Sequence, residues 1–469
     1  MTEPSGAHAA RQDRVRIAPE QLADAIATGE IDTVVAAFPD LQGRLVGKRT
    51  TGRFYLEHVA GAEGYEACDY LIATDMDNNP VPGYRFASYQ QGYGDVRAVV
   101  DPATIRFTPW VDRTALVLCD LVDVDTGAPI DVSPRQILRR QEEAAAALGY
   151  TPMLASEIEF YLFRDSYEEA HAKGYQGLTP HSAFLEDYHV LQTTKDEYLI
   201  GQIRRGLEVA GVPCEFSKGE AGRGQHEINL DYTTAVEMAD RNVVYKTAAK
   251  EIAALNGRAI SFMAKYDFED TGSSCHIHSS LWDAAAGRSL MDDHHGEHGM
   301  SDLFRWYLGG LLATAQEFAI LFAPYINSYK RFQPGSWAPT TVGWGIDNRT
   351  LGFRKVGHGG GTRVECRIPG SDANTYLAFA ATIAGGLHGI RHQIEPPAPF
   401  DGSGYDDHDL PRIPWNLVDA IDLWETSAVA KEAFGEEVHF HLLNCARQEW
   451  MAFNRCVTDW ELARYFERS

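Results

Sequence analysis

Apolar and polar residues alternate with a period of two along several short stretches of the chain, which is typical of β-strands with one buried face. In residues 31–49, IDTVVAAFPDLQGRLVGKR, two apolar runs flank an Asp-Leu-Gln-Gly turn, and this predicts a hairpin. Residues 113–123, RTALVLCDLVD, predict another strand at the end of an N-terminal section. Four further stretches alternate in the same way: SEIEFYLF, QHEINL, CHIHSSLW and RVECRIP. The pattern therefore predicts strands both in the N-terminal section and in the rest of the chain.

Helical patterns fill much of the sequence between these strands. Residues 133–149 start with Ser133 as an N-cap and Pro134 in the first turn, and Gly149 is expected to end this helix. Three further helices are predicted over residues 197–211, 234–257 and 303–323. Residues 1–14 are expected to form a disordered tail. We therefore predict an α+β fold with a small N-terminal β-rich domain and one large mixed domain.

Composition narrows the class of protein. With 44% hydrophobic residues, the chain of 469 residues can bury a substantial core. Its net charge of −24 argues against nucleic acid or an anionic membrane as a partner. The seven cysteines form no Cys-x-x-Cys pair, and the sequence has neither an apolar leader segment nor a long apolar run. We expect a soluble, cytoplasmic protein with reduced thiols.

Acidic side chains on the polar faces of the strands are the first candidates for chemistry. Glu157 and Glu159 lie two residues apart in SEIEFYLF and therefore share a face, where their charges repel. For any single strand, a solvent-exposed polar face is the simpler explanation. As a set, six residues are expected to gather for metal ions: Glu157, Glu159, Glu220, Glu227, His276 and Glu365. Carboxylates with a single histidine favour Mg²⁺ or Mn²⁺ over zinc.

Arginines provide the second group of candidates. Several are suited to hold phosphate and carboxylate groups, namely Arg331, Arg349, Arg354, Arg363 and Arg367. Metal ions together with several arginines are what phosphoryl transfer requires. The chain has no Walker A or Gly-x-Gly-x-x-Gly motif, and GHGGGTR at 357–363 lacks the Lys-Ser/Thr ending of a P-loop. The sequence therefore indicates phosphoryl transfer at a site that is not a P-loop.

The chain resembles the glutamine synthetase family over nearly its whole length. The matching segments, in order, are FPDLQGRLVGKR, SEIEFYLF, EAGRGQHEINL, FMAKYDFEDTGSSCHIHSS, NSYKRFQPGSWAP, DNRTLGFR and RVECRIPGSDANTYLAFAA. The GKR ending, the RFQPG loop and the VTDWE tail are similar to the γ-glutamyl–amine ligase branch of that family. The resemblance implies a β-grasp domain over 15–110 and a catalytic domain with a β-funnel over 111–469. It also implies a homo-oligomer, a dodecamer of two stacked hexameric rings with active sites between adjacent subunits.

The resemblance also implies roles for individual residues, carried over position by position. Two Mg²⁺ or Mn²⁺ ions are implied in each active site. The ion near glutamate is expected on Glu159, Glu220 and Glu227, and the ion near the ATP phosphates on Glu157, His276 and Glu365. The residues expected to bind ATP are Glu215, Tyr232, His278, Ser280, Arg354 and Arg363. Those expected to bind glutamate are Gly272, Arg331 and Arg367. Three residues are expected to act in catalysis: Arg349, an Asp40 supplied by the neighbouring subunit, and Trp337.

One position departs from the pattern of family members that use ammonia. Those members carry a glutamate on the loop after the Pro-Gly turn, whereas this chain has Trp337 there, after Pro334 and Gly335. The indole is explained either by simple wall packing or by contact with the carbon chain or ammonium of a larger amine. We therefore expect Trp337 to act at the amine site.

The predicted function is ATP-dependent ligation. The enzyme is expected to join the γ-carboxylate of glutamate to a primary alkylamine, either ethanolamine or putrescine or another polyamine, through γ-glutamyl phosphate. One alternative is an ammonia-using glutamine synthetase. A further alternative is a non-catalytic ring protein with a structural or sensing role.

Overall fold

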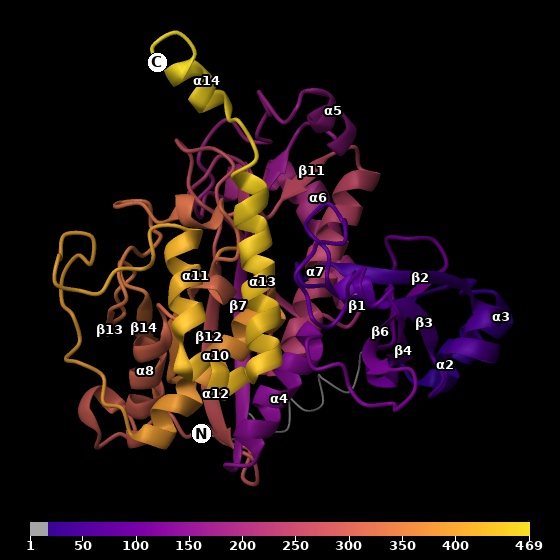
Figure 1. The fold of residues 1–469 in the computed structure, drawn as a ribbon, viewed down its shortest axis with the longest axis horizontal. Helices are drawn as coiled ribbons and strands as arrows, with labels where there is room; N and C mark the ends of the chain where they lie inside the picture. Colours follow the sequence, from indigo (N-terminus) through magenta and orange to yellow (C-terminus); the bar gives the residue numbers. More distant parts are fainter. Residues whose placement is uncertain (1–16) are drawn as a thin grey trace.

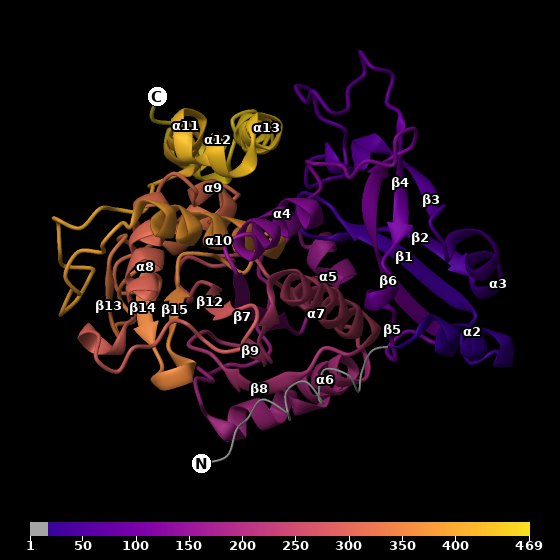
Figure 2. The ribbon, with the colours of Figure 1, turned by 90° about the horizontal axis from the view of Figure 1, so that it is seen from below.

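The computed structural model describes residues 17–469, so the predicted tail at 1–14 lies outside the described residues. A smaller part with the N-terminal strands stands to one side of a larger body that holds the other strands and most helices (Figures 1 and 2). The mixture of helices and strands confirms the predicted α+β class. One apolar core runs through both parts, from Val34 and Phe38 to Phe379 and Trp424. In the part of the chain that the structure describes, no helix is long and apolar enough to span a bilayer.

The smaller part is built on a six-stranded sheet in the order β2-β1-β6-β4-β3, with β5 paired to β6. Its elements are α2 Pro19–Thr28, β1 Thr33–Pro39, β2 Leu45–Thr51, α3 Gly52–Phe54, β3 Tyr65–Cys68, β4 Asp95–Val100, β5 Arg106–Phe107 and β6 Thr114–Asp123. β1 and β2 pair antiparallel, which confirms the predicted hairpin. β6 confirms the strand predicted at 113–123 and runs parallel to β1. The predicted domain boundary at residue 110 stays a prediction. β6 follows that boundary in the sequence and yet belongs to the sheet of the smaller part.

The larger body contains a nine-stranded sheet in the order β13-β14-β15-β12-β7-β9-β8, with β10 and β11 also paired to β7. Its strands are β7 Tyr150–Phe163, β8 Cys214–Gly219, β9 Gln225–Leu230, β10 Thr233–Thr234, β11 Ala259–Ser261, β12 Cys275–Asp283, β13 Trp344–Ile346, β14 Phe353–Val356 and β15 Arg363–Cys366. The four alternating stretches of the sequence lie in β7, β9, β12 and β15, which are near neighbours in this order. Their polar faces can therefore meet.

Helices cover the sheet and complete the body. They are α4 Pro134–Ala146, α5 Tyr167–Ala172, α6 Val190–Val209, α7 Ala235–Leu255, α8 Asp302–Thr314, α9 Ala319–Phe322, α10 Thr375–His392, α11 Leu417–Thr426, α12 Ala428–Phe434, α13 Glu436–Phe453 and α14 Asp459–Tyr465. Beyond α13 the chain continues into α14, which projects away from the body (Figure 1).

The predicted helices exist, but some of their ends differ. α4 stops at Ala146, and Gly149 lies in the following turn with a φ of 82°. α6 begins at Val190, before the predicted start at 197, because the ring of His189 accepts a hydrogen bond from the backbone of Gln192. Histidine is not among the usual N-cap residues, so the sequence carried no signal for this start. The stretch 303–323 is divided into α8 and α9, where Phe318 in the intervening turn packs against aromatic rings of α11 and α12.

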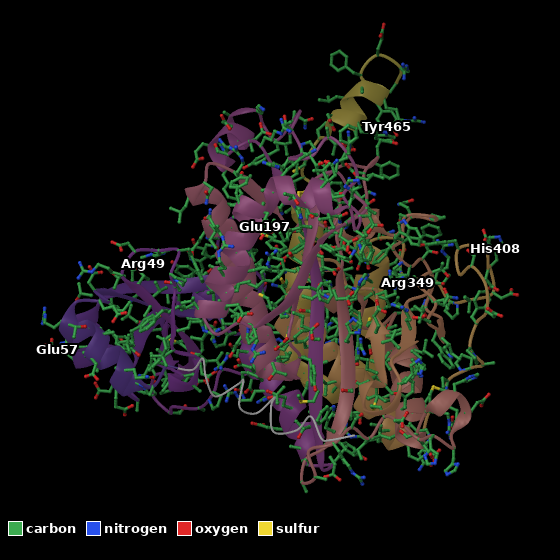
Figure 3. The ribbon with its side chains drawn as sticks, turned by 180° about the vertical axis from the view of Figure 1, so that it is seen from behind. Arg49, Glu57, Glu197, Arg349, His408 and Tyr465 are labelled. Atoms are coloured by element: carbon green, nitrogen blue, oxygen red, sulfur yellow. The ribbon has the colours of Figure 1, made fainter. Side chains whose placement is uncertain are left out.

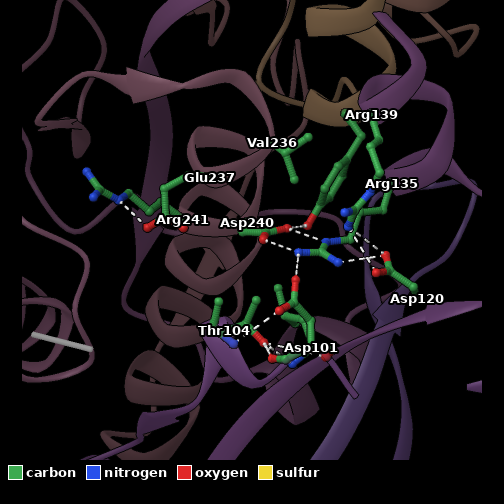
Figure 4. A network of polar contacts seen from close by, with 12 residues as sticks. Asp101, Thr104, Asp120, Arg135, Arg139, Val236, Glu237, Asp240 and Arg241 are labelled. Atoms are coloured by element: carbon green, nitrogen blue, oxygen red, sulfur yellow. Dashed lines mark hydrogen bonds and ion pairs between the residues drawn. The ribbon is translucent and has the colours of Figure 1, made fainter. Parts of the chain in front are cut away.

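A buried arginine links the two parts of the molecule (Figure 4). Arg135 of α4 contacts Asp240 of α7 through Nε and Nη2, at 3.0 and 2.9 Å. It also contacts Asp120 of β6 at 2.6 Å and Asp101, just after β4, at 2.7 Å. The hydroxyl of Tyr376 in α10 donates to Asp240 at 2.6 Å. We call Arg135 and its three aspartates the arginine hub, and it holds the six-stranded sheet against the helices of the body.

Candidate active site

The register of β7, β9 and β12 brings the predicted metal ligands together. Glu157 lies opposite His276, and Glu159 lies opposite Glu227. Directly opposite residues of an antiparallel pair point to the same face of the sheet, so these four side chains share one surface. Nδ1 of His276 is 3.1 Å from Glu157 and 3.7 Å from Glu365 of β15. Ligand atoms of Glu157, His276 and Glu365 all lie within 4.8 Å of one another, so these three side chains could hold one cation.

A second group of acids lies beside the first. Glu159, Glu227 and His276 also offer ligand atoms within 4.8 Å of one another, and Glu220, on the turn between β8 and β9, faces the same cavity. Burial and the charge of Glu220 raise the pKa of Glu159 to about 8. Burial and the charges of Glu157, Glu220 and Glu159 raise the pKa of Glu227 well above its ordinary value. These shifts arise because the acids repel one another in a dry place, and bound cations would relieve that repulsion.

These acids open onto a cavity of about 360 Å³. The other predicted site residues along its walls are Gly272, Arg331, Trp337, Arg349, Arg354 and Arg367. The predicted metal ligands, the predicted glutamate ligands and two of the predicted catalytic residues therefore surround one space. Arg349 is exposed and lies on the larger body, far from Glu57 of the smaller part (Figure 3).

A second cavity, of about 250 Å³, adjoins the first, and Glu157 and Asn229 line both. Its walls include most of the predicted ATP ligands, namely Glu215, Tyr232, His278, Ser280 and Arg363. Arg354, also predicted to bind ATP, lines the first cavity instead. The two cavities thus separate the predicted nucleotide residues from the predicted acid-substrate residues, and Glu157 stands at the boundary.

Hydrogen bonds orient the side chains at this boundary. Nε2 of His278 is 2.9 Å from Glu157, while its Nδ1 accepts from Nε of Arg363 at 3.1 Å. A nitrogen that accepts carries no hydrogen, so His278 is the tautomer that donates from Nε2 to Glu157. Two arginines bind Glu365, Arg367 at 2.6 Å and Arg354 at 2.8 Å. Burial alone would raise the pKa of Glu365, but the charges of Arg367 and the neighbouring histidines lower it to about 2.

Several buried polar atoms at the cavity lack a partner among the described residues. They are Nε of Arg354, Nε of Arg367 and Oδ1 of Asn229. Arg331, by contrast, donates to the carbonyl oxygens of Ile368 and Arg367 at 2.8 and 3.0 Å, so its guanidinium is held in place before any ligand binds. Unpaired buried donors are costly, and a bound anion would satisfy those of Arg354 and Arg367. The arginines of this cavity therefore fit anionic substrates, and its carboxylates fit cations.

Trp337 lies on the rim of the first cavity, with 59% of its side chain surface exposed. Its φ is 64°, a left-handed conformation that is unusual for a bulky residue and costs on the order of 1 kcal/mol or more. Nη2 of Arg367 contacts the carbonyl oxygen of Trp337 at 3.3 Å and so ties this backbone to the arginines of the site. The loop is thus held in a strained form that leaves the indole accessible.

Asp40 is the one predicted site residue that lines neither cavity of this chain. It lies in the turn after β1 and is fully buried. Its carboxylate accepts from the backbone N–H of Arg44 at 2.7 Å and from Nε of Arg44 at 2.8 Å. Its predicted role in the active site of a neighbouring subunit stays a prediction.

Sequence reasoning missed one wall of the first cavity. Asp187, Tyr188, Phe216 and Lys218 line it, and Lys218 bridges them: its Nζ contacts Glu220, lies 3.6 Å from Asp187 and lies 4.4 Å from the ring centre of Tyr188. A weak signal existed in SKGE, where Lys218 stands two residues before Glu220 on an alternating strand. Asp187 and Tyr188 lie in an irregular segment whose sequence has no periodicity.

Comparisons with known proteins agree with this geometry. The family model of the glutamine synthetase catalytic domain matches residues 131–465. The chain is 51% identical over 449 residues, 96% of each protein, to gamma-glutamylethanolamide synthetase GlnA4 of Streptomyces coelicolor. It is 35% identical over 447 residues, 95% of this chain and 97% of the relative, to the glutamate–isopropylamine ligase of a Pseudomonas species. A solved structure titled GmaS/ADP complex superimposes with a TM-score of 0.83 at 27% identity, covering 95% of this chain and 99% of that one.

These matches cover both the smaller part and the larger body. Enzymes of the matched family are ligases that use ATP and divalent metal ions, which accords with the cation and anion sites described above. The membership predicted from the sequence motifs is confirmed. This chain belongs to the glutamine synthetase family.

Proposed function

We propose that this protein joins the γ-carboxylate of glutamate to a primary alkylamine, with ATP as co-substrate and γ-glutamyl phosphate as intermediate. Among the amines predicted from the sequence, ethanolamine is the acceptor best supported, because the 51% identical relative is named for it. The observation that carries the proposal is the first cavity, whose walls bring together an acid cluster, several arginines and the exposed Trp337. The acid cluster consists of Glu157, Glu159, Glu220, Glu227, His276 and Glu365. Ammonia alone would not need an apolar surface of this size.

The acid cluster fits two divalent ions, Mg²⁺ or Mn²⁺, per site. Glu159, Glu220 and Glu227 would hold one, and a second would lie on Glu157, His276 and Glu365. The fit rests on the raised pKa values of Glu159 and Glu227 and on the oxygen-rich donor set. Bound ions would neutralise charge on the ATP phosphates and on the γ-carboxylate as it accepts the phosphoryl group.

The chain's own groups would orient and stabilise the reacting molecules. In the second cavity, Glu215, Tyr232 and Ser280 would contact the nucleotide, with His278 and Arg363 linked to Glu157 behind them. In the first, Gly272, Arg331 and Arg367 would contact glutamate.

Arg349 and Arg354 face the same space, where they would stabilise negative charge on the phosphoryl group as it is transferred to the γ-carboxylate. Arg331 and Arg367 are already held by protein hydrogen bonds, so little reorganisation would be needed at the moment of reaction.

The amine would enter along the aromatic side of the first cavity. The rings of Tyr188, Phe216 and Trp337 are all substantially exposed there. They would cover the carbon chain of the amine, and an indole or phenol face also attracts an ammonium group. An alkylammonium has a pKa of about 9 to 10 and must lose a proton before it attacks the acyl phosphate. Nearby carboxylates, together with Asp40 of an adjacent subunit, would bind the ammonium and accept that proton.

Assembly into two stacked hexameric rings forms part of the proposal. α14 projects from the body and has the exposed apolar side chains Trp460 and Leu462, and exposed Phe466 directly follows Tyr465, the last residue of the helix (Figure 3). Such an arm has an apolar surface that a second subunit could cover. Mass measurement of the purified protein would test the oligomeric state.

An ADP-release assay with glutamate and a panel of amines tests the proposed function. We expect the highest kcat/KM with ethanolamine, lower values with putrescine and isopropylamine, and the lowest with ammonium. The highest kcat/KM with ammonium would show a glutamine synthetase instead. Absence of ADP release with every amine at saturating Mg²⁺ or Mn²⁺ would favour the structural or sensing role.

A further inference from the structure

A second buried cluster of titratable side chains lies directly behind the acid cluster, on the opposite face of β9. Glu227 of this strand points to the cavity, and the preceding His226 therefore points away from it. There His226 meets Glu186, from the segment before α6, and Asp196 of α6 itself. These three side chains are at most 1% exposed. His181 approaches Asp196 from the outer side.

The hydrogen bonds of this cluster leave one carboxylate without a donor. Nε2 of His226 is 2.9 Å from Oδ2 of Asp196 in a hydrogen bond, and it is also 3.2 Å from Oε2 of Glu186. A ring nitrogen carries at most one hydrogen, so it cannot serve both carboxylates. Nδ1 of His181 is 2.5 Å from the other oxygen of Asp196. Neither oxygen of Glu186 has a partner among the described residues that meets both the distance and the angle of a hydrogen bond, although Ser182, Asp196 and His226 lie beside it.

The chain is shaped to bring Glu186 to this position. A Cβ atom on Gly219 of β8 would lie 2.5 Å from both Cβ and the carbonyl oxygen of Glu186, so only glycine allows this approach. The backbone N–H of Tyr188 then reaches the carbonyl oxygen of Gly219 at 3.4 Å. A buried carboxylate without a donor is strongly unfavourable unless a counter-charge meets it. The close packing against Gly219 fixes the backbone and Cβ of Glu186 beside β8.

We propose that Glu186, Asp196 and His226 bind one structural divalent cation, with Zn²⁺ as the expected occupant. Their ligand atoms lie within 4.8 Å of one another. The separations of 2.9 and 3.2 Å from Nε2 are close to the roughly 3.0 to 3.4 Å between neighbouring ligands when metal–ligand bonds are about 2.1 Å long. Two carboxylates balance the charge of the ion. Unlike Glu157, His276 and Glu365, which open onto a cavity, these three ligands are closed off from solvent, and Mg²⁺ gives up its water reluctantly whereas structural zinc sites are closed. His181 orients Asp196 through the oxygen that faces away from His226.

This site is distinct from the acid cluster and has a structural consequence for it. Glu186 is followed directly by Asp187 and Tyr188, which line the first cavity. An ion shared by Glu186, α6 and β9 would fix that wall from behind. The binding of zinc does not depend on the proposed ligase activity; only its effect on the amine side of the cavity does.

Zinc content after exchange tests the proposal. The full-length protein is incubated with Zn²⁺, then dialysed against excess Mg²⁺ with citrate, so that exposed and oxygen-rich sites exchange their zinc. Mass spectrometry of the metals should find about one zinc per chain in the wild type and less than a tenth of that in Glu186→Gln and Asp196→Asn. A zinc-edge anomalous diffraction peak should lie between Glu186, Asp196 and His226.

Two control variants distinguish other sources of zinc. Glu365→Gln removes a proposed ligand of the acid cluster and should keep the retained zinc. The double variant His388→Ala/His392→Ala removes a second possible ligand group, on the surface at the end of α10, and should also keep it. A wild type that retains no zinc, or an anomalous peak only elsewhere, would overturn the proposal without any variant having to fold. Equal zinc retention by well-folded Glu186→Gln would overturn it as well.

Discussion

The arginine hub and the active-site acids are both buried groups of carboxylates, yet their charges are balanced in opposite ways. In the hub, Arg135 contacts Asp101, Asp120 and Asp240. Burial alone would raise the pKa of Asp101, but the charge and hydrogen bond of Arg135 lower it below its ordinary value. The hub therefore carries its own counter-charge within the chain.

Glu159 and Glu227 of the active site have too little counter-charge, whereas Arg367 and the neighbouring histidines supply it for Glu365. Lys218 pairs with Glu220, while Glu159 and Glu227 keep raised pKa values because burial and neighbouring acids both oppose their ionisation. The hub contributes to folding stability, whereas the repulsion at Glu159 and Glu227 lowers the stability of the metal-free protein and keeps their oxygens available for cations. A site under such repulsion is prepared to bind an external charge. The presence or absence of a counter-charge within the chain thus separates acids that stabilise the fold from acids that are suited to bind an external cation.

The largest expected effect is on turnover. Glu365→Ala should lower glutamate- and amine-dependent ADP release by at least about a thousandfold, because it removes a proposed metal ligand and the shared partner of Arg354 and Arg367. Steady-state kinetics at several Mg²⁺ concentrations would measure this. Glu297→Ala, in an exposed loop, is the matched control and should keep wild-type turnover. Turnover by Glu365→Ala within tenfold of wild type would contradict the assignment of this acid to the site.

The hub should show the opposite behaviour. Arg135→Ala leaves three aspartates without their shared cation and should lower the free energy of unfolding by about 3 kcal/mol. The KM values of the fraction that remains folded should stay near those of the wild type.

Chemical denaturation would measure this loss. Arg113→Ala, which breaks an exposed ion pair with Asp32, is the control and should cost less than about 1 kcal/mol. If Arg135→Ala lowers the free energy of unfolding no more than the control does, the hub does not stabilise the contact between the two parts.

The pH dependence of metal-free protein should reveal the repulsion directly. The pKa of Glu159 is about 8 in the folded chain, whereas the ordinary value of 4.5 applies to the unfolded chain. Between pH 4.5 and 8, the folded state therefore holds more protons than the unfolded state. Stability should therefore be greatest near and below pH 4.5 for this group, fall by at most about 1.4 kcal/mol per pH unit between pH 4.5 and 8, and level off above pH 8.

Thermal unfolding between pH 6 and 9 would measure the slope, and saturating Mg²⁺ should reduce it. Glu227→Gln should also reduce the slope and stabilise the metal-free chain, because it removes one of the repelling charges. An unchanged slope in both experiments would mean that the acids do not repel one another as proposed.

The smallest expected effect concerns the amine. Trp337→Glu should raise the ratio of kcat/KM for ammonium to kcat/KM for ethanolamine by about tenfold, because it replaces an apolar wall with an anion beside the acid cluster. Trp337→Phe is the control, since it keeps an apolar ring and should change the ratio little. If the ratio is the same in Trp337→Glu and the wild type, the indole does not contact the amine.

The sequence by itself determined the family and indicated most of the charged side chains that line the first cavity. Period-two alternation placed Glu157 and Glu159 on one face, and the ordered motifs identified the family, because both depend only on residues close together in the chain. The same reasoning could not find the wall of Asp187 and Tyr188, nor the start of α6, since neither has a local periodic signal.

Tertiary structure alone decided which faces meet. β7 lies between β9 and β12, so the acidic side chains of these three strands form one cluster. It also placed Glu227 toward the cavity and His226 toward Glu186 and Asp196 on the other side of the same strand. Strand order, the burial that raises the pKa values of the acids and the charges that balance them all come from residues far apart in sequence. Local propensity and periodicity contain no information about such distant contacts.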